Sequence, residues 1–383
     1  MVTRNSIKFA LLVCAAAAGL VAATTFAPST AAEKKPLKIY VSTGFEGNTW
    51  MDASTNLLRA IAKTKAYKDR VTLEIQSARG DAQTQQQQIN AMTQAGADII
   101  LAWPISPTAL NRAVRAACQK GVTFFTWDAE VTEPCAHYVG IDQEWAGAGP
   151  AEWLAQKLNG KGNIIFMGGI PGTMVDTRRN AAAKGVFAEY KDIKIIADTP
   201  SMWNSATARQ KMAEIIAAQG WDRIDGVWTQ TGCGEFVKLE VEAGRKDFKP
   251  CAGNGTNGFR NSMLKSGAGD GATGGPGVSM GSPPWAAPYA FKLAVDARDG
   301  QDVPRINQVP MPLVTNETVG NVDTQPNVFC QKADRAELIK TNYACTAVPL
   351  SVAASNFYID VWSPKVPELD LYSALNGSVP EGQ

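Results

Sequence analysis

From residue 37 onward, short apolar runs alternate with amphipathic stretches, and this alternation restricts the fold more than any other feature. The first round predicts strands at 37–43, 71–77, 98–102 and 122–127, and helices at 50–65, 81–95 and 107–119. Strands that are apolar along their whole length are typical of parallel sheets covered by helices on both faces. The pattern therefore predicts an α/β fold made of βαβ units.

The same alternation resumes after residues 137–141, so the fold is expected to be doubled. The second round predicts helices at 143–158, 176–190, 205–218 and 235–243, and strands at 163–167, 193–197, 226–229 and 249–253. A Gly-rich loop is expected at 267–281, a helix at 286–298 and a strand at 305–314. A chain of 383 residues is long enough for two such lobes. The composition of residues 322–383 changes to Pro, Asn and Ser, which predicts a tail across the surface.

The N-terminus has the pattern of an export signal. Arg4 and Lys8 precede an apolar run at 9–23, which is followed by small residues up to Ala32. A charged start, an apolar middle and a small-residue end are typical of a cleavable signal peptide. We expect residues 1–32 to be removed; the alternative, a lipoprotein acylated at Cys14, fits less well because the bulky Val13 precedes the cysteine.

Cysteine spacing predicts disulfides. Of seven cysteines, Cys14 would leave with the signal, and the remaining six fall into three close couples. An even number of cysteines in an exported chain indicates disulfides, and the absence of any CxxC disfavours a metal or redox site. Among the 15 possible pairings, we expect Cys118–Cys135, Cys233–Cys251 and Cys330–Cys345.

Charge and histidine content exclude several functions. The 37 Lys and Arg nearly balance 36 Asp and Glu, so the basic footprint of a nucleic-acid binder is missing. The single histidine, His137, excludes zinc sites built on several histidines and disfavours histidine acid–base catalysis. His137 stands two residues from Cys135, and we expect it to be structural.

Two glycine-rich motifs do not meet the requirements of nucleotide sites. Residues 253–258 match GxGxxG between an expected strand and helix. Dinucleotide binding also needs an acid at the end of the next strand, whereas Asp270 lies in a Gly-rich loop. That loop lacks the Gly-Lys-Ser/Thr ending of a phosphate loop, and the chain has no GxSxG elbow.

Tryptophans fall where the strands are expected to end. The set consists of Trp50, Trp103, Trp127, Trp203 and Trp285. In open α/β sheets, ligands bind beyond the carboxyl ends of the strands. Indole faces stack on the C–H faces of sugar rings, while nearby carboxylates and amides bond to hydroxyls. The pattern therefore predicts a site for a sugar-like molecule.

Taken in order and spacing, these residues resemble the type I periplasmic binding proteins of the ribose/galactose branch, which serve ABC transporters. The resemblance covers roughly residues 37–314, and its most specific stretches are 41–43, 48–51, 101–104, 125–128, 169–179, 227–231 and 252–256. It implies two lobes joined by three crossings near Ile141, Ser282 and Leu313. The implied lobes are 37–141 with 283–312 and 142–282 with 313–321, followed by a 322–383 extension.

The resemblance also implies a set of ligand-binding positions. They are Phe45, Asn48, Trp50, Met51, Trp103, Asp128, Thr177, Arg179, Trp203, Thr231, Asn254 and Ser282. Asp128 keeps an acid of the family, but Ala129 and Thr177 stand where arginines are frequent. Asp128 is therefore expected to lack a neutralising arginine, and the ligand to be smaller or less hydroxylated than ribose or galactose.

The function that this resemblance implies is solute capture rather than catalysis. We expect a monomeric periplasmic receptor that binds a sugar or polyol and delivers it to an ABC permease, with no cofactor, metal or nucleic acid. Three alternatives stay open: a tryptophan cage for an aromatic or cationic metabolite, a chemoreceptor-coupled sensor and a secreted glycoside hydrolase. A hydrolase needs paired carboxylates, and Asp128 and Glu130 would point apart on an extended segment.

Overall fold

Two separate six-stranded sheets organise the chain. The computed structural model describes residues 35–253, 255–311 and 313–316, and in the C-terminal part 350, 352–353, 355–361, 363 and 365–380. Both sheets belong to the unit that begins at Pro36. The expected signal peptide, Asn254, and the couple Cys330 and Cys345 lie outside the described residues.

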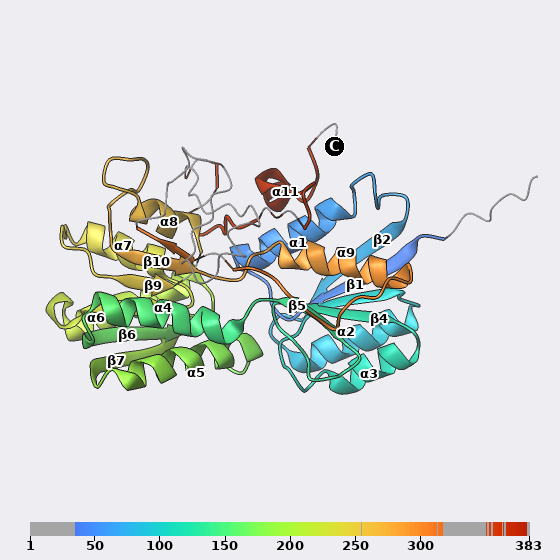
Figure 1. The fold of residues 1–383 in the computed structure, drawn as a ribbon, viewed down its shortest axis with the longest axis horizontal. Helices are drawn as coiled ribbons and strands as arrows, with labels where there is room; N and C mark the ends of the chain where they lie inside the picture. Colours follow the sequence, from blue (N-terminus) through green and yellow to red (C-terminus); the bar gives the residue numbers. More distant parts are fainter. Residues whose placement is uncertain are drawn as a thin grey trace, which may run out of the picture. The chain divides into compact units, whose positions relative to one another are not determined.

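The first sheet has the strand order β11-β5-β4-β3-β1-β2, and each neighbouring pair is parallel. Its strands are β1 (Leu37–Thr43), β2 (Val71–Ser77), β3 (Ile99–Trp103), β4 (Thr123–Trp127), β5 (His137–Gly140) and β11 (Ile306–Gln308). The helices that cover it are α1 (Thr49–Ile61), α2 (Ala82–Gln94), α3 (Asn111–Gln119) and α9 (Ala286–Arg298). Figure 1 shows α1 and α9 on one face of the sheet and α2 and α3 on the other. All of β3 is buried, as expected for a strand covered on both faces.

The second sheet has the order β12-β10-β9-β8-β6-β7, and only β12 runs antiparallel to its neighbour within the described residues. Its strands are β6 (Lys161–Gly168), β7 (Asp192–Pro200), β8 (Gly226–Thr229), β9 (Cys251–Gly253), β10 (Gly277–Met280) and β12 (Leu313–Thr315). The helices of this half are α4 (Gln143–Lys157), α5 (Met174–Glu189), α6 (Ser205–Gln219), the 3₁₀ turn η1 (Trp221–Arg223), α7 (Cys233–Glu242) and α8 (Asn257–Met263). Two mostly parallel sheets confirm the predicted fold class.

The chain passes between the two halves three times, close to the expected positions. It leaves the first sheet after β5, returns after β10 to form α9, and passes again between β11 and β12. The single strand expected at 305–314 is therefore wrong, because β11 pairs with β5 and β12 pairs with β10. Pro310 separates them, and it has no backbone N–H to extend a ladder. The predicted lobe boundaries stay a prediction.

Polar N-caps fix where several helices begin, directly beyond the strand ends. Asn48 caps α1 by accepting a hydrogen bond from the Met51 backbone N–H, and Asn204 caps α6 in the same way. Thr173 caps α5 and Asp142 caps α4. Each cap satisfies a backbone donor that the first helical turn leaves without a partner. These caps hold the loops at the carboxyl edges of both sheets.

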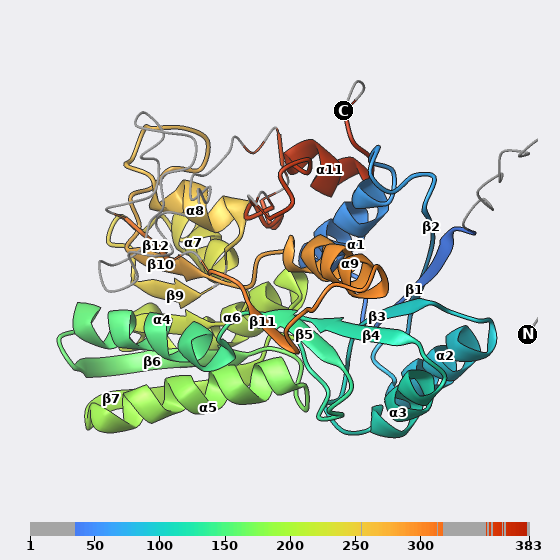
Figure 2. The same ribbon diagram turned by 45° about the vertical axis from the view of Figure 1, so that its right-hand side comes forward.

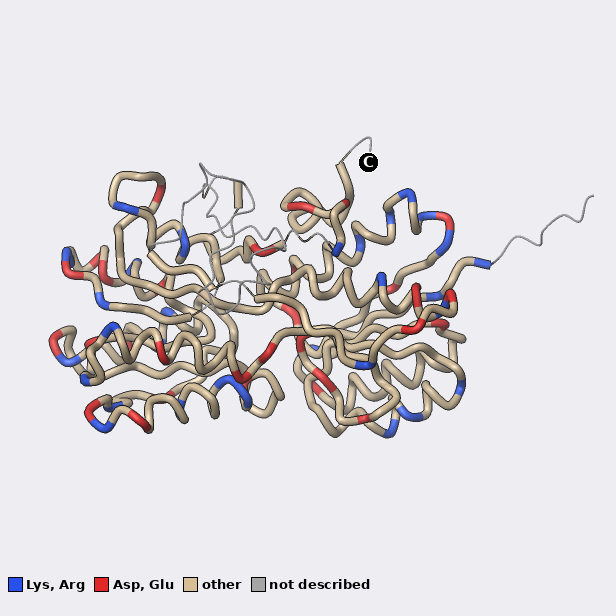
Figure 3. The backbone as a smooth tube through the Cα atoms, in the orientation of Figure 1, with Lys and Arg blue, Asp and Glu red and all other residues tan. Residues whose placement is uncertain are grey.

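The described surface carries charges of both signs. Lys and Arg are interspersed with Asp and Glu along both halves of the chain (Figure 3). This agrees with the balanced composition of the chain. Among the described helices, none combines the length and apolar character needed to cross a membrane.

The described C-terminal residues lie deeper than the surface tail that composition predicts. Val366 and Leu369 are fully buried. The short helix α11 (Leu371–Asn376) packs against α1, as both ribbon views show (Figures 1 and 2). The composition of this region, rich in Pro, Asn and Ser, therefore accompanies an irregular backbone whose described residues are nevertheless packed.

Candidate functional site

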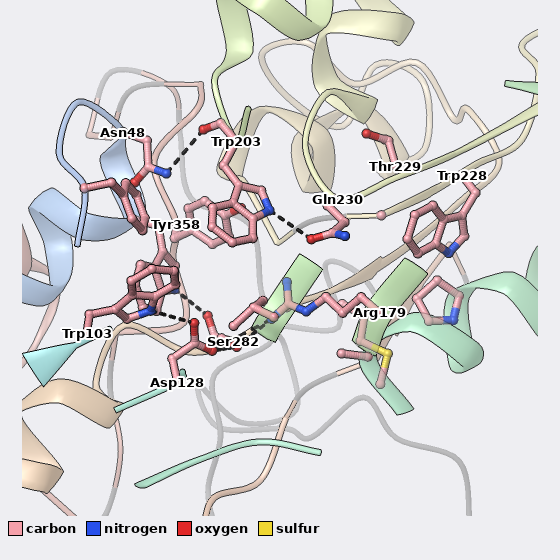
Figure 4. A pocket seen from close by; sticks show the side chains of 18 residues that line it. Asn48, Trp103, Asp128, Arg179, Trp203, Trp228, Thr229, Gln230, Ser282 and Tyr358 are labelled. Atoms are coloured by element: carbon pink, nitrogen blue, oxygen red, sulfur yellow. Dashed lines mark hydrogen bonds and ion pairs between the residues drawn. The ribbon is translucent and has the colours of Figure 1, made fainter. Parts of the chain in front are cut away.

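A cavity lies between the two halves, at the carboxyl ends of their strands (Figure 4). One wall follows β1, β3 and β4, the other follows β7, β8, β9 and β10, and α1, α4 and α5 contribute their first turns or faces. The lining residues are Phe45, Asn48, Trp50, Trp103, Asp128, Ala146, Pro150, Val175, Arg179, Trp203, Trp228, Thr229, Gln230, Gly253, Met280, Gly281, Ser282 and Tyr358. Its volume of about 50 Å³ has room for a few water molecules.

The structure brings together most of the residues that the resemblance implied. Eight of the twelve line this cavity: Phe45, Asn48, Trp50, Trp103, Asp128, Arg179, Trp203 and Ser282. They come from both halves of the chain and are separated by up to 237 positions, 282 − 45. Their role toward a ligand stays a prediction.

Three implied residues do not line the cavity, and each has a physical reason. Met51 follows Trp50 by one helical step, so its side chain turns into the apolar core. Thr177 is exposed, and its hydroxyl donates to the carbonyl of Thr173, the N-cap of α5. Thr231 lines a neighbouring cavity of about 250 Å³ instead.

An aromatic cluster joins the two walls. The ring centroids of Phe45 and Trp103 are 4.7 Å apart, and Trp203 lies 5.6 Å from Phe45 and 5.8 Å from Trp103. Phe45 follows β1 and Trp103 ends β3 in the first sheet, whereas Trp203 follows β7 of the second. The Asn48 side-chain amide also donates to the Trp203 carbonyl at 3.2 Å. These contacts hold the two walls close together.

Trp203 has an unusual backbone conformation, and its indole ring occupies space that Gly169 leaves open. Met202 and Trp203 both have positive φ angles, 56° and 48°, which non-glycine residues seldom adopt. The indole N–H donates to the Gln230 side-chain oxygen at 2.9 Å, and Gln230 in turn donates to Asp176 and Asn180. A Cβ atom on Gly169 would lie 2.1 Å from the indole nitrogen, so only glycine leaves Trp203 its place.

Asp128 is the centre of a buried polar network. Its Oδ2 accepts from the Trp103 indole N–H at 3.0 Å, and its Oδ1 accepts from the Gln143 amide at 2.9 Å and from the Ser282 hydroxyl. Arg179 Nη2 lies 3.8 Å from Oδ1 and donates to Ser282 at 2.8 Å. The expectation that Asp128 lacks a neutralising arginine is therefore wrong. Ala129 does stand in the adjacent position, but the guanidinium comes from α5, in the other half of the chain.

Comparison with known protein families decides the assignment of the chain. The family model described as "Periplasmic binding protein domain" matches residues 39–302. This chain belongs to that family. The resemblance found in the sequence is thereby confirmed, and the matched segment contains every described cavity-lining residue except Tyr358.

Known relatives of this periplasmic binding protein carry names of sugar and polyol binders. It is 33% identical over 186 residues to the xylitol-binding protein of Mycolicibacterium smegmatis, covering 48% of this chain and 53% of that protein. It is 29% identical over 161 residues to the D-xylose-binding periplasmic protein of Escherichia coli, covering 40% and 47%. The chain thus matches about half the length of these curated relatives. A solved ABC transporter solute binding protein from Thermobispora bispora has the same fold, with a TM-score of 0.66, 22% identity and coverage of 80% and 94%.

Several cavity residues of this binding protein were missed by sequence reasoning. Trp228, Thr229 and Gln230 sit at the end of β8, where the same strand-end argument applies and would have found them. No sequence signal pointed to Tyr358, which lies in the C-terminal segment. Conversely, Trp127 ends an expected strand and Trp285 follows the Gly-rich loop, yet both are fully buried outside the cavity lining.

Two of the three expected disulfides of this binding protein are present. Cys118 of α3 is joined to Cys135 before β5, and Cys233 of α7 is joined to Cys251 of β9. The third couple lies outside the described residues and stays a prediction. His137 stacks on Phe125 at 4.4 Å, and its Nδ1 lies 3.1 Å from the Pro304 carbonyl oxygen, away from the cavity.

Proposed function

We propose that this protein is an exported periplasmic receptor that binds a pentose-sized sugar or polyol between the two walls of the described cavity, which must move apart to admit it, and delivers it to an ABC importer. The observation that carries the proposal is one lining set that combines indole faces with the Asp128–Arg179 pair. Apolar faces suit the C–H groups of a sugar, and the ion pair suits its hydroxyls, which both donate and accept.

The polar network leaves defined positions for hydroxyl groups. A carboxylate accepts about four hydrogen bonds, and Trp103, Gln143 and Ser282 supply three to Asp128. One acceptor position on Oδ2 therefore remains. Arg179 donates through Nε to Gln143 and through Nη2 to Ser282, while its Nη1 donates to no described residue. A hydroxyl pair of the ligand would donate to Asp128 and accept from Arg179.

Charge argues against a tryptophan cage for a cation. Asp128 is the one carboxylate among the described lining residues, and Arg179 lies 3.8 Å from it. A cationic ligand would therefore meet a guanidinium beside the carboxylate, and the two protein charges offset one another. A neutral ligand with several hydroxyls carries no charge for the Arg179 guanidinium to repel, so the ion pair does not weaken its binding.

Glycoside hydrolysis is disfavoured by the same lining. Retaining and inverting enzymes use two carboxyl groups on either side of the scissile bond. The second acid considered from the sequence, Glu130, forms an ion pair with Arg178 at 2.5 Å and does not line the cavity. The described site therefore offers one carboxylate where such a reaction needs two.

The relatives support the proposed size of the ligand, and the family supports the proposed location of the protein in the periplasm. The curated relatives are named for xylitol and D-xylose, which have five carbons. The family description is periplasmic, and the N-terminal sequence has the pattern of a cleavable signal. The permease partnership and the monomeric state rest on the same family membership.

A thermal-shift screen tests the proposal. Xylitol, D-xylose, D-galactose, myo-inositol and choline would each be added to the oxidised protein at rising concentration. A ligand that binds only the folded state raises the melting temperature by mass action. We expect a rise with at least one five-carbon compound and none with choline. A rise with choline alone, or turnover of a xyloside, would contradict the proposal.

A further inference from the structure

The described C-terminal residues attach to the second half of the chain through backbone hydrogen bonds. Tyr358 forms an isolated antiparallel bridge with Thr256, just before α8. The backbone N–H of Asn257 donates to the Phe357 carbonyl at 2.8 Å, and that of Gly258 donates to the Ser355 carbonyl at 2.5 Å. This short stretch therefore lies against the start of α8 in a defined register.

A buried ion pair fixes the same stretch. Arg260 of α8 donates from Nη1 to Asp360 Oδ1 at 2.7 Å and from Nη2 to Oδ2 at 2.6 Å. Arg260 is fully buried, Asp360 is 2% exposed, and the guanidinium Nε also donates to Ser279 of β10. A two-pronged arginine–carboxylate contact defines both the distance and the orientation of its partners.

The segment attaches to the first half as well. The Thr49 hydroxyl at the start of α1 donates to the Asn356 carbonyl. Further along, the Asn56 amide of α1 donates to the Ala374 carbonyl of α11 at 2.9 Å, and Lys63 reaches the Gly377 carbonyl at 2.9 Å. Figures 1 and 2 show α11 lying along α1. The C-terminal segment, meaning the described residues 355–361, 363 and 365–377, therefore touches elements of both halves.

Between these attachments, Tyr358 reaches the site. It lines the described cavity and also the neighbouring cavity, whose other members include Asn48 and Trp203 (Figure 4). A Cβ atom on Gly281 would lie 3.7 Å from the Tyr358 ring, an ordinary contact distance, so the ring lies close to the backbone after β10. Tyr358 is thus part of the partition between the two cavities.

From this arrangement we propose that the C-terminal segment completes the ligand site and that Tyr358 is a specificity-determining residue that contacts the bound sugar or polyol. The inference rests on the proposed function. The Arg260–Asp360 pair and the α1–α11 contact act as positioning elements, because they hold the ring against the cavity from both halves. A tyrosine presents a flat apolar face and a hydroxyl, which suits the alternating C–H and O–H groups of such a ligand.

Substitutions in the full-length oxidised protein test the inference by calorimetric titration with xylitol, D-xylose, D-galactose and myo-inositol. Tyr358→Ala should weaken binding of the preferred compound about tenfold or more, as loss of a central aromatic contact does. Tyr358→Phe should change the order of preference among the four compounds. Tyr372→Ala is the matched control, since Tyr372 lies on α11 of the same segment and is 47% exposed; its affinity should stay within about twofold of the wild type.

Asp360→Asn tests the positioning elements with a readout that needs no ligand. The amide protons of Asn257 and Gly258 should exchange faster in this variant, because their acceptors belong to the released stretch, and affinity should fall with them. Unchanged affinity and preference in both Tyr358 variants, beside a wild type that binds, would overturn this inference alone. The other outcome is that neither the wild type nor the Tyr372→Ala variant binds any of the four compounds, although the amide protons stay protected. That outcome would overturn the proposed function and the inference with it.

Discussion

The indole N–H of Trp103 donates to Oδ2 of Asp128 at 3.0 Å, so the residue that ends β3 is joined to the residue that follows β4. Asp128 has a φ of 58°, a left-handed conformation that aspartate tolerates better than most residues. This backbone turns the carboxylate back toward Trp103 and toward Arg179 of the other half. The Asp128 carboxylate thereby contacts both the end of the neighbouring strand and an arginine from the opposite wall.

Asp128→Asn should lower both stability and ligand affinity. An amide nitrogen in place of one carboxylate oxygen would leave one of the three surrounding donors without an acceptor and Arg179 without its counter-charge. We expect a loss of about 1–3 kcal/mol in the free energy of unfolding and a ten- to hundredfold weaker affinity for the preferred sugar or polyol. Melting curves and calorimetry measure the two effects.

Asp142→Asn serves as the control for that variant. Asp142 caps α4 by accepting from the Trp145 backbone N–H, and asparagine caps helices equally well. Stability and affinity should both stay near the wild-type values. If Asp128→Asn lowered stability but left affinity intact, Asp128 would brace the loops without contacting the ligand.

Gly169→Ala should weaken binding without removing any atom that lines the cavity. The added Cβ would lie 2.1 Å from the Trp203 indole nitrogen and 2.2 Å from its Cε2, so the ring must shift. We expect about a tenfold loss of affinity. Gly185→Ala in α5 is the matched control, because an added Cβ there meets nothing within 4 Å. It should leave affinity unchanged and raise helix stability by up to about 1 kcal/mol.

Reduction of the disulfides should lower the melting temperature. The two observed bonds close loops with sequence separations of 17 and 18 residues. In the chain-entropy model, each contributes about 3 kcal/mol by restricting the unfolded chain. Mass spectrometry of unreduced digests should find these two linked peptides, and also the predicted Cys330–Cys345 peptide. Free thiols at Cys118 or Cys233 in the oxidised protein would contradict the assignment.

Stability should fall as the pH rises from about 5 to about 8, because of Glu240. This carboxyl group on α7 is fully buried; its Oε1 accepts from the Lys249 backbone N–H, and its Oε2 has no hydrogen-bond partner among the described residues. Burial raises the pKa of Glu240 to about 7, and the nearby Arg245 and Lys249 only partly oppose this. A raised acid pKa favours the protonated folded state, so its contribution is complete below the unfolded pKa and is lost as the pH rises through 7.

The size of this effect follows from the shift in the pKa. It is up to about 3 kcal/mol, at 1.36 kcal/mol for each pKa unit. Melting curves across the pH range should show a flatter slope for Glu240→Gln. Glu242→Gln is the matched control, because Glu242 lies two positions further along the same helix and its side chain is exposed. This variant should keep the wild-type slope. A wild-type slope in the Glu240 variant would show that another group is responsible.

Local patterns were enough to predict the fold. The predicted helix at 286–298 coincides with α9, and the helix expected at 143–158 differs from α4 by one residue. Each such element carries its own periodicity, which needs no knowledge of its neighbours. The local pattern of residues 305–314 predicted one strand, because it does not show that β11 and β12 join different sheets; only the family resemblance implied a crossing near Leu313.

The cavity was predictable only where strand order places residues together. Trp103 and Asp128 follow neighbouring parallel strands, so their meeting follows from sheet geometry. The approach of Arg179 to Asp128 depends on how the two halves face one another, and no local pattern encodes it. Tyr358 reaches the site through the Arg260–Asp360 pair, a contact across 100 positions of the chain.

Calorimetric titration of the oxidised wild-type protein with xylitol, D-xylose and choline tests the central claim most directly. The account predicts a saturable signal with one binding site for at least one of the two five-carbon compounds, with a Kd in the micromolar range or tighter, about −8 kcal/mol. Choline should give no saturable heat, because Arg179 already accompanies the Asp128 carboxylate. Saturable binding of choline with no signal from either five-carbon compound would contradict the account.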